Sequence, residues 1–337
     1  MLKLRPDQGS KPRLSHNCAF IVGCPRSGTS WLQLLLNQHP QIATTKETHL
    51  FNGYLDRLWR AWEHYKSLRS GIGLTQLLSE EDFYQLCAAF AGSVFQRIAD
   101  TKPGSSLVLE KTPDHVRFAP FILRLLPDAQ FLHMIRDPRS VVTSLVSAAR
   151  SWGRDWAQNS IVDNASLWRS DVRLGRQISA LTDRYHEVRY EELMGNRGAE
   201  TLERIFAWLG LPVELGFCQA TLRTCSFERM QQNREEIRDY KSTNRTGTAD
   251  WANIFPRPEI LRKGRIDSWK EELSQTEIAM VEYLAGDLMQ ECGYSPSGVR
   301  IGVGIKLRLK TRAALDLVER QTRRMLDRAF RKARSVM

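Results

Sequence analysis

The chain has 337 residues, of which 42% are hydrophobic and 26% charged, and its formal net charge is +11. This composition is typical of an ordinary soluble enzyme, and the length allows one domain with a large core. No stretch approaches the roughly 20 apolar residues of a membrane span, and residues 1–17 lack the apolar centre of a signal peptide. We therefore expect a cytoplasmic protein.

Near the N-terminus, an apolar run over residues 19–22 predicts a buried strand, which a tight turn and a helix start follow. Gly23 and Gly28 have the spacing of a nucleoside-triphosphate-binding loop, but Thr29 stands where such a loop carries its lysine. The cation of this turn is Arg26 instead. Backbone N–H groups at such a turn bind a phosphate or phosphosulfate, so the segment predicts a nucleotide site without fixing the reaction.

Apolar runs and helical patterns alternate along the rest of the chain. Ser79 with Asp82 and Ser274 with Glu277 have the spacing of helix N-terminal capping boxes. The alternation predicts an α/β fold with a P-loop-like central parallel sheet flanked by helices on both faces. The further strands that we expect span residues 41–44, 106–109, 130–135 and 185–189.

The turn after the strand at 130–135 gives a second sign of a site. Asp137 followed by Pro138 predicts a capped helix start, which places Arg136 at the carboxyl end of that strand. In open α/β sheets, ligands bind beyond the carboxyl ends of the strands, where the loop at 25–29 also lies. Two separate motifs therefore predict one cleft.

The positive charge is concentrated at the C-terminal end. Residues 300–337 contain twelve Lys or Arg against three acidic residues, a net charge of +9, which leaves +2 for the rest of the chain. Between 311 and 333, apolar residues recur at helical spacing among arginines, which predicts a basic amphipathic helical tail. Such a helix binds an anionic membrane surface or an acidic polymer, or packs on the body as a solvated helix.

The six cysteines form no C-x-x-C pair and no metal-ligand cluster. Reduced thiols in a reducing compartment are the expectation. They are Cys18, Cys24, Cys87, Cys218, Cys225 and Cys292.

The first loop resembles that of the sulfotransferases, enzymes that take a sulfuryl group from 3′-phosphoadenosine 5′-phosphosulfate (PAPS). The resemblance extends over about residues 20–294. It implies that Trp31 lies where an indole packs on the adenine. The residues that it assigns to the 5′-phosphosulfate loop are Pro25, Arg26, Ser27, Gly28, Thr29, Ser30 and Trp31.

Three further motifs resemble this family, in the family's order. Arg136 and Ser144, eight positions apart, match the pair that binds the 3′-phosphate, the group that distinguishes PAPS from ATP. A forked guanidinium and a hydroxyl also suit a dianionic phosphate on physical grounds, because charge-assisted hydrogen bonds are strong. Tyr190 resembles the tyrosine that contacts the nucleotide in tyrosylprotein sulfotransferases. The loop that closes over the 3′-phosphate in cytosolic enzymes is matched by Arg262, Lys263 and Gly264.

Sulfuryl transfer requires an activated acceptor, an in-line approach and a positively charged group at the bridging oxygen, where negative charge develops. Glu47 is similar to the carboxylate base of tyrosylprotein and heparan-type carbohydrate sulfotransferases. Lys111 resembles the lysine that faces the sulfuryl oxygens, and Arg26 would share that task. If its segment is extended, His49 shares a face with Glu47 and would orient the base or bind the acceptor.

One departure from the cytosolic enzymes bears on the base. Those enzymes carry a histidine two residues after the corresponding lysine, but here Pro113 stands at that place and His115 follows Lys111 by four positions. Glu47 is therefore the expected base, and His115 is the alternative. Because a sulfuryl group carries less negative charge than a γ-phosphoryl group, protein cations suffice and we expect no metal.

The sequence thus predicts a PAPS-dependent sulfotransferase with a hydroxyl acceptor, namely a carbohydrate, a glycolipid or another small molecule, or else tyrosine. The aromatic residues of the segment 52–102 would form the acceptor wall or a helix core. No nucleic-acid partner is expected, and the basic tail would contact a membrane surface or a polyanion. The alternatives are a P-loop kinase or nucleoside triphosphatase and a catalytically silent nucleotide-binding protein.

The expected organisation has three parts. Residues 1–16 form a flexible N-terminus, residues 17–298 a sulfotransferase domain, and residues 299–337 the basic amphipathic helical tail.

Overall fold

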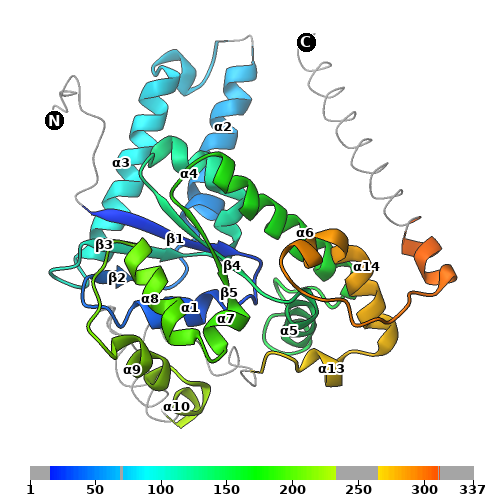
Figure 1. Cartoon of the computed structure of the whole chain (residues 1–337). Coiled ribbons are helices and arrows are strands. Elements are labelled where there is room, and N and C mark those ends of the chain that lie inside the picture. Colours follow the sequence, from blue (N-terminus) through cyan, green and yellow to red (C-terminus); the bar gives the residue numbers. More distant parts are fainter. Residues whose placement is uncertain (1–15, 69–70, 233–264, 310, 312–337) are drawn as a thin grey trace.

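A computed structural model describes residues 16–68, 71–232, 265–309 and 311. Its centre is a parallel sheet of five strands in the order β2-β3-β1-β4-β5 (Figure 1). The α/β fold with a P-loop-like parallel sheet is confirmed. The strands are β1 (Asn17–Gly23), β2 (Ile42–Thr44), β3 (Leu107–Lys111), β4 (Gln130–Ile135) and β5 (Tyr185–Arg189).

Helices cover both faces of the sheet, and a third group packs at one end of it (Figure 1). The first face packs against α1 (Thr29–Leu36) and α8 (Gly198–Trp208), and the second against α3 (Glu80–Ala99) and α4 (Ala119–Leu125). The other elements are η1 (Leu50–Leu55), α2 (Asp56–Ser67), η2 (Leu74–Gln76), η3 (Pro113–Phe118), α5 (Pro138–Arg150), α6 (Ile161–Gln177), η4 (Ile178–Ala180), α7 (Tyr190–Met194), α9 (Phe217–Thr224), α10 (Phe227–Gln232), α13 (Trp269–Glu272) and α14 (Gln275–Glu291).

The central strand β1 shows why the sequence forms this sheet. It pairs in parallel with β3 on one side and β4 on the other, and all its residues after Asn17 are buried. A strand covered on both faces needs a continuous apolar run, which residues 18–22 supply. Phe20 packs on the α3 face, and Ile21 on the α1 face. The strand ends at Gly23, so the following loop lies at the carboxyl edge of the sheet.

The predicted helix starts are confirmed. Ser79 and Ser274 each form a complete capping box, and the Asp137 side chain accepts a hydrogen bond from the Arg139 backbone at the start of α5. The third predicted strand is longer than expected, because β3 continues through Lys111.

The aromatic residues of the segment 52–102 mostly form a helix core. Trp62 of α2 and Phe83 of α3 are buried and stack with their ring centroids 4.4 Å apart. Trp59 stacks on Phe121 of α4. Figure 1 shows α2 and α3 side by side, extending away from the sheet. The acceptor-wall interpretation of these three rings is therefore wrong, because they hold the two helices together and on the body.

The chain ends lie largely outside the described residues. Of the predicted tail, the structure describes 299–309 and 311, and residues 303–309 are helical. The predicted boundaries of the N-terminus and of the tail stay predictions. None of the helices in the described ranges is long and apolar enough to cross a membrane. All six cysteines are buried and free of disulfides, as free thiols require.

Candidate active site

A cavity of about 370 Å³ lies beyond the carboxyl ends of β1, β4 and β5. Ligands of open parallel sheets bind at this edge, because the loops that follow neighbouring strands converge there. The structure therefore brings the first loop and the end of β4 together, as the two motifs require. The predicted residues on the cavity wall are Arg26, Gly28, Thr29, Ser30, Trp31, Arg136, Ser144 and Tyr190.

The first loop is shaped by one glycine. Gly28 has φ 98° and stands immediately before α1. A Cβ atom at this position would lie 2.4 Å from the ring of Tyr190, so both the backbone conformation and the space require glycine. Arg26 also has a positive φ, of 74°, which is uncommon for a residue with a side chain. The loop thus turns sharply and presents the N-terminus of α1 to the cavity.

Arg136 and Ser144 both line the cavity but contact different partners. The Arg136 guanidinium lies 4.1 Å from the centroid of the Tyr190 ring, and its Nη2 donates to the backbone oxygen of Arg265 at 3.1 Å. Within the described residues, Arg136 Nε has no hydrogen-bond partner. Ser144 Oγ accepts a hydrogen bond from Arg26 Nε at 3.0 Å. The serine therefore connects α5 to the first loop.

Trp31 and Tyr190 form one aromatic wall of the cavity. Their ring centroids are 5.7 Å apart in an edge-to-face arrangement. The indole Nε1 of Trp31 donates to the Cys225 backbone oxygen at 2.9 Å, which fixes the ring. Burial raises the pKa of Tyr190, so its hydroxyl stays protonated at neutral pH. The stacking of Trp31 on an adenine stays a prediction.

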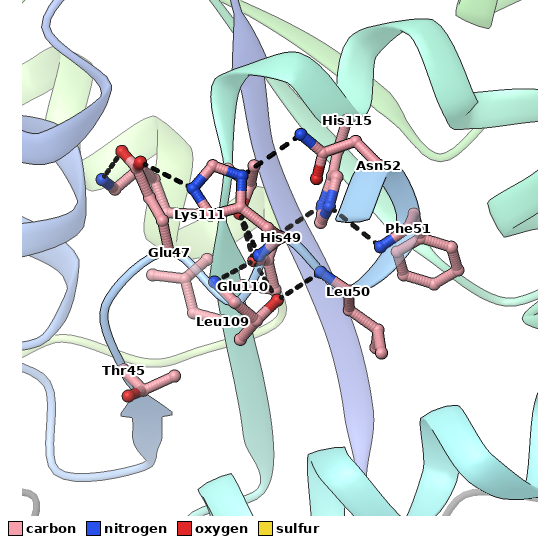
Figure 2. A network of polar contacts seen from close by, with 12 residues as sticks. Thr45, Glu47, His49, Leu50, Phe51, Asn52, Leu109, Glu110, Lys111 and His115 are labelled. Carbon is pink, nitrogen blue, oxygen red and sulfur yellow. Dashed lines mark hydrogen bonds and ion pairs between the residues drawn. The ribbon is translucent and has the colours of Figure 1, made fainter. Parts of the chain in front are cut away.

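Glu47 and Lys111 lie together beside Ser30, at the C-terminal end of the first loop (Figure 2). Lys111 Nζ donates to Glu47 Oε1 at 2.6 Å and to Ser30 Oγ at 3.1 Å. The lysine side chain is 6% exposed, whereas that of Glu47 is 38% exposed. The predicted lysine therefore connects the predicted base to the first loop, and the base is partly exposed to solvent.

His49 reaches Glu47 by a different backbone path from the predicted one. Its Nε2 lies 3.6 Å from Glu47 Oε2, and its Nδ1 pairs with the Asn52 side-chain nitrogen at 3.2 Å. The segment is not extended, because His49 has φ 50° and leads directly into η1. The imidazole is half-exposed beside the carboxylate, a position from which it can contact an acceptor.

His115 is used for structure. The ring is fully buried, its Nε2 accepts the Phe51 backbone N–H at 3.3 Å, and its Nδ1 lies 2.8 Å from Glu110 Oε2. Because Nε2 accepts, the ring proton lies on Nδ1 and is donated to Glu110. Both ring nitrogens are thus occupied, and the geometry does not favour His115 as the base.

A family model of the sulfotransferases matches residues 19–214, more than half of the chain. The chain belongs to the sulfotransferase family. Nodulation protein NoeE of Sinorhizobium fredii is 25% identical in an alignment 305 residues long that covers 82% of this chain and 66% of that protein. Protein-tyrosine sulfotransferase A of Caenorhabditis elegans is 30% identical in an alignment 249 residues long that covers 72% of this chain and 62% of that protein. The chain thus spans less than two thirds of the length of either relative.

Two solved structures share the fold of this sulfotransferase. The sulfotransferase domain of the Synechococcus PCC 7002 olefin synthase has a TM-score of 0.51 at 21% identity, over 86% of this chain and 99% of that domain. Mouse sulfotransferase SULT7A1 complexed with PAP has a TM-score of 0.54 at 15% identity, over 83% of this chain and 89% of that chain. Family and fold support sulfuryl transfer in general and do not favour a kinase or a nucleoside triphosphatase.

Arg262, Lys263 and Gly264 lie outside the described residues, and the next residue, Arg265, lines the cavity. In the part of the chain that the structure describes, no group of three or more His, Cys, Asp or Glu side chains is arranged to hold a metal ion.

Sequence reasoning missed two features of the site. One is Trp152, whose ring lies 5.4 Å from the Arg26 guanidinium and 5.3 Å from the ring of Trp156. The available signal was a pair of tryptophans four residues apart in a polar stretch after α5. The other is Glu110, which precedes Lys111 in the sequence and points away from the cavity. Neither role follows from local sequence, because both depend on contacts between distant segments.

Proposed function

We propose that this sulfotransferase transfers the sulfuryl group of PAPS to a hydroxyl of its acceptor, with Glu47 as the general base. The observation that carries the proposal is that Lys111 contacts both Glu47 and Ser30. One ammonium thus lies between the group that would take the acceptor's proton and the loop that would hold the sulfuryl group. Such a shared contact would keep the base and the sulfuryl group close together, as an in-line displacement needs.

The donor would lie along the cavity wall. The first loop and the N-terminus of α1 suit its 5′-phosphosulfate, and Trp31 with Tyr190 offers an aromatic surface to the adenine. Arg136 and Ser144 would bind the 3′-phosphate. The mouse structural neighbour is a complex with PAP, the product that PAPS leaves after transfer, which supports the same donor here.

The reaction balances with the residues at hand. The acceptor hydroxyl oxygen forms a bond to sulfur while its proton passes to the Glu47 carboxylate. The bond from sulfur to the bridging oxygen breaks, and the electron pair leaves with adenosine 3′,5′-bisphosphate. The Lys111 ammonium and the Arg26 guanidinium stabilise the negative charge that develops on the bridging and sulfuryl oxygens. Protein cations carry this whole task in the proposal.

For the acceptor, we favour a carbohydrate. Trp152 stands beside Arg26, and its ring lies 5.3 Å from the ring of Trp156, which is 47% exposed. An exposed tryptophan that packs with a second one next to a cation suits a ligand with an apolar ring face and polar edges, which describes a pyranose. Peptide tyrosine is the second candidate, because curated relatives are protein-tyrosine sulfotransferases.

The experiment is transfer of radiolabelled sulfate from PAPS to a panel of methyl pyranosides, short oligosaccharides and a tyrosine peptide. Glu47→Gln should lower turnover by about 10²–10⁴-fold, because the hydroxyl loses its proton acceptor. Its affinity for adenosine 3′,5′-bisphosphate, measured by calorimetry, should stay near that of the wild type. The matched control is Glu63→Gln on the exposed side of α2.

Three results would contradict the proposal. Wild-type protein that binds adenosine 3′,5′-bisphosphate no better than AMP would remove PAPS as the donor. Undiminished turnover of Glu47→Gln would remove the base. Transfer to the tyrosine peptide with no transfer to any sugar would contradict the carbohydrate acceptor, but not the proposed transfer of the sulfuryl group with Glu47 as the base.

A further inference from the structure

Two neighbouring charged residues of β3, Glu110 and Lys111, point to opposite faces of the sheet. Side chains alternate along a strand, so neighbours point to opposite faces of the sheet. Val108 packs with the core on the α3 face, and Leu109 with the core on the α1 face. Glu110 follows Val108 onto the α3 face and is 1% exposed, whereas Lys111 reaches the first loop. A carboxylate is thus buried directly behind the lysine of the site.

The Glu110 carboxylate is saturated with hydrogen bonds (Figure 2). Its Oε1 accepts from Thr112 Oγ1 at 2.7 Å and from Thr48 Oγ1 at 2.8 Å, and its Oε2 accepts from His115 Nδ1 at 2.8 Å. Thr48 stands between Glu47 and His49 in the sequence. One buried group therefore connects the segment of the base to the strand of the lysine.

The same network satisfies the backbone at the start of η1. The first N–H groups of a helix have no partner within the helix and need acceptors from elsewhere. Here the four consecutive N–H groups of residues 48–51 all donate to side chains of the network. Their acceptors, in order, are Glu110 at 3.4 Å, Thr112 at 3.4 Å, Thr48 at 3.1 Å and His115 at 3.3 Å.

The surroundings of Glu110 favour its ionised form. Burial alone would raise the pKa of Glu110, but the interaction with His115 and the hydrogen bonds from the Thr112 and Thr48 hydroxyls outweigh it. The pKa therefore lies below its ordinary value, and the group is ionised at neutral pH. A carboxylate also interacts favourably with the positive end of a helix, and its hydrogen bonds are stronger than those of a neutral amide.

We infer that Glu110 is a positioning residue, which holds Glu47 against Lys111 and His49 beside Glu47, through Thr48 and the start of η1. His49 has φ 50°, a conformation that residues with a side chain adopt rarely, so its backbone needs such support. The Glu110 carboxylate sets the relative position of two segments whose contact, the 2.6 Å bond from Lys111 to Glu47, forms the centre of the site. This inference rests on the proposed function, because it assigns Glu110 a role through the base.

The test is a double-mutant cycle on turnover. Glu110→Gln keeps the shape of the side chain, but its amide nitrogen cannot accept the bonds that a second carboxylate oxygen accepts. We expect its turnover to fall by about 10–100-fold, the value of a hydrogen bond to a charged group. In the Glu47→Gln background the same change should have almost no further effect on turnover. Glu110 acts by positioning the base, and that variant has no base left to position. Affinity for adenosine 3′,5′-bisphosphate should stay within about twofold of the wild type.

A second pair of variants covers the case in which Glu110→Gln does not fold. Thr48→Val removes one hydroxyl from the network and should lower turnover, and Thr48→Ser, which keeps the hydroxyl, should restore it. Losses that multiply in the double variant, or equal turnover of Thr48→Val and Thr48→Ser, would overturn the inference. A wild-type protein without sulfate transfer would instead overturn the proposed function, so the two failures are distinguishable.

Discussion

The cluster around Lys111 and the cavity wall around Arg136 differ in how their polar atoms are partnered. Lys111 is buried and bonded to Glu47 and Ser30, and Glu110 behind it accepts hydrogen bonds on both oxygens. Arg136 stacks on Tyr190, and its Nε has no partner among the described residues. The cluster is thus organised by the protein itself, as we expect of groups that do chemistry, while the wall contains a buried guanidinium nitrogen without a partner in the described residues.

The largest effect should come from the cluster. Lys111→Ala removes the ammonium beside Glu47 and Ser30, and we expect turnover to fall by about 10²–10³-fold, as for the loss of a transition-state donor. Affinity for adenosine 3′,5′-bisphosphate should change little, which calorimetry would show. Lys66→Ala, on the exposed side of α2, is the matched control. If donor affinity fell as much as turnover, Lys111 would belong with the cavity wall, and the comparison would fail.

His133 belongs to neither the cluster nor the cavity wall, and its effect on stability serves as a reference for pH measurements on those two regions. His133 of β4 is fully buried, and its Nδ1 pairs with the Tyr185 hydroxyl at 2.7 Å. Burial lowers its pKa from 6.5 to about 4, so below pH 6.5 the unfolded chain binds a proton that the folded protein does not. The free energy of unfolding should therefore decrease as the pH is lowered from 6.5 to 4, by about 3 kcal/mol in total.

Urea unfolding at several pH values would measure this loss. His133→Gln, which cannot titrate, should show a flatter profile between pH 6.5 and 4. An unchanged profile in the variant would assign the acid sensitivity to other groups. With this contribution known, a decline of turnover in acid can be divided between the cluster and the stability of the whole protein.

The cavity wall should affect the donor and not the chemistry. Arg136→Ala should weaken binding of adenosine 3′,5′-bisphosphate by about 10–100-fold, since hydrogen bonds to charged groups contribute about 1.5–3 kcal/mol. AMP lacks the 3′-phosphate, so its affinity should be nearly unchanged. Calorimetry with both ligands makes AMP the internal control. Equal losses for the two nucleotides would show that Arg136 supports the Tyr190 wall and does not bind a phosphate.

Local patterns were enough to predict the frame of this site. The apolar run of β1, the capping boxes at Ser79 and Ser274, and the position of Arg136 after β4 all depend on neighbours within a few residues. Side-chain partners were not predictable in this way. Ser144 bonds Arg26 across 118 positions, and Glu110 bonds Thr48 across 62.

The backbone of His49 illustrates the same limit. A free segment of this sequence has no reason to adopt φ 50° at a histidine. The conformation is supported by acceptors that satisfy the N–H groups of residues 48–51, namely Glu110 of β3, Thr112, His115 of η3 and the hydroxyl of Thr48 itself. Its proximity to Glu47 was predicted from an extended geometry that the folded chain does not have.

The smallest expected effect concerns Ser144, which lies on the cavity wall and contacts Arg26, the residue that would share the task of Lys111. Ser144→Ala removes one neutral acceptor and should weaken binding of adenosine 3′,5′-bisphosphate by about 2–10-fold, or about 0.5–1.5 kcal/mol. If the serine acts on the 3′-phosphate, the loss should be absent for AMP. If it acts by holding Arg26, both nucleotides should lose affinity equally, since the 5′-phosphate is common to them. A loss confined to turnover would place Ser144 with the cluster.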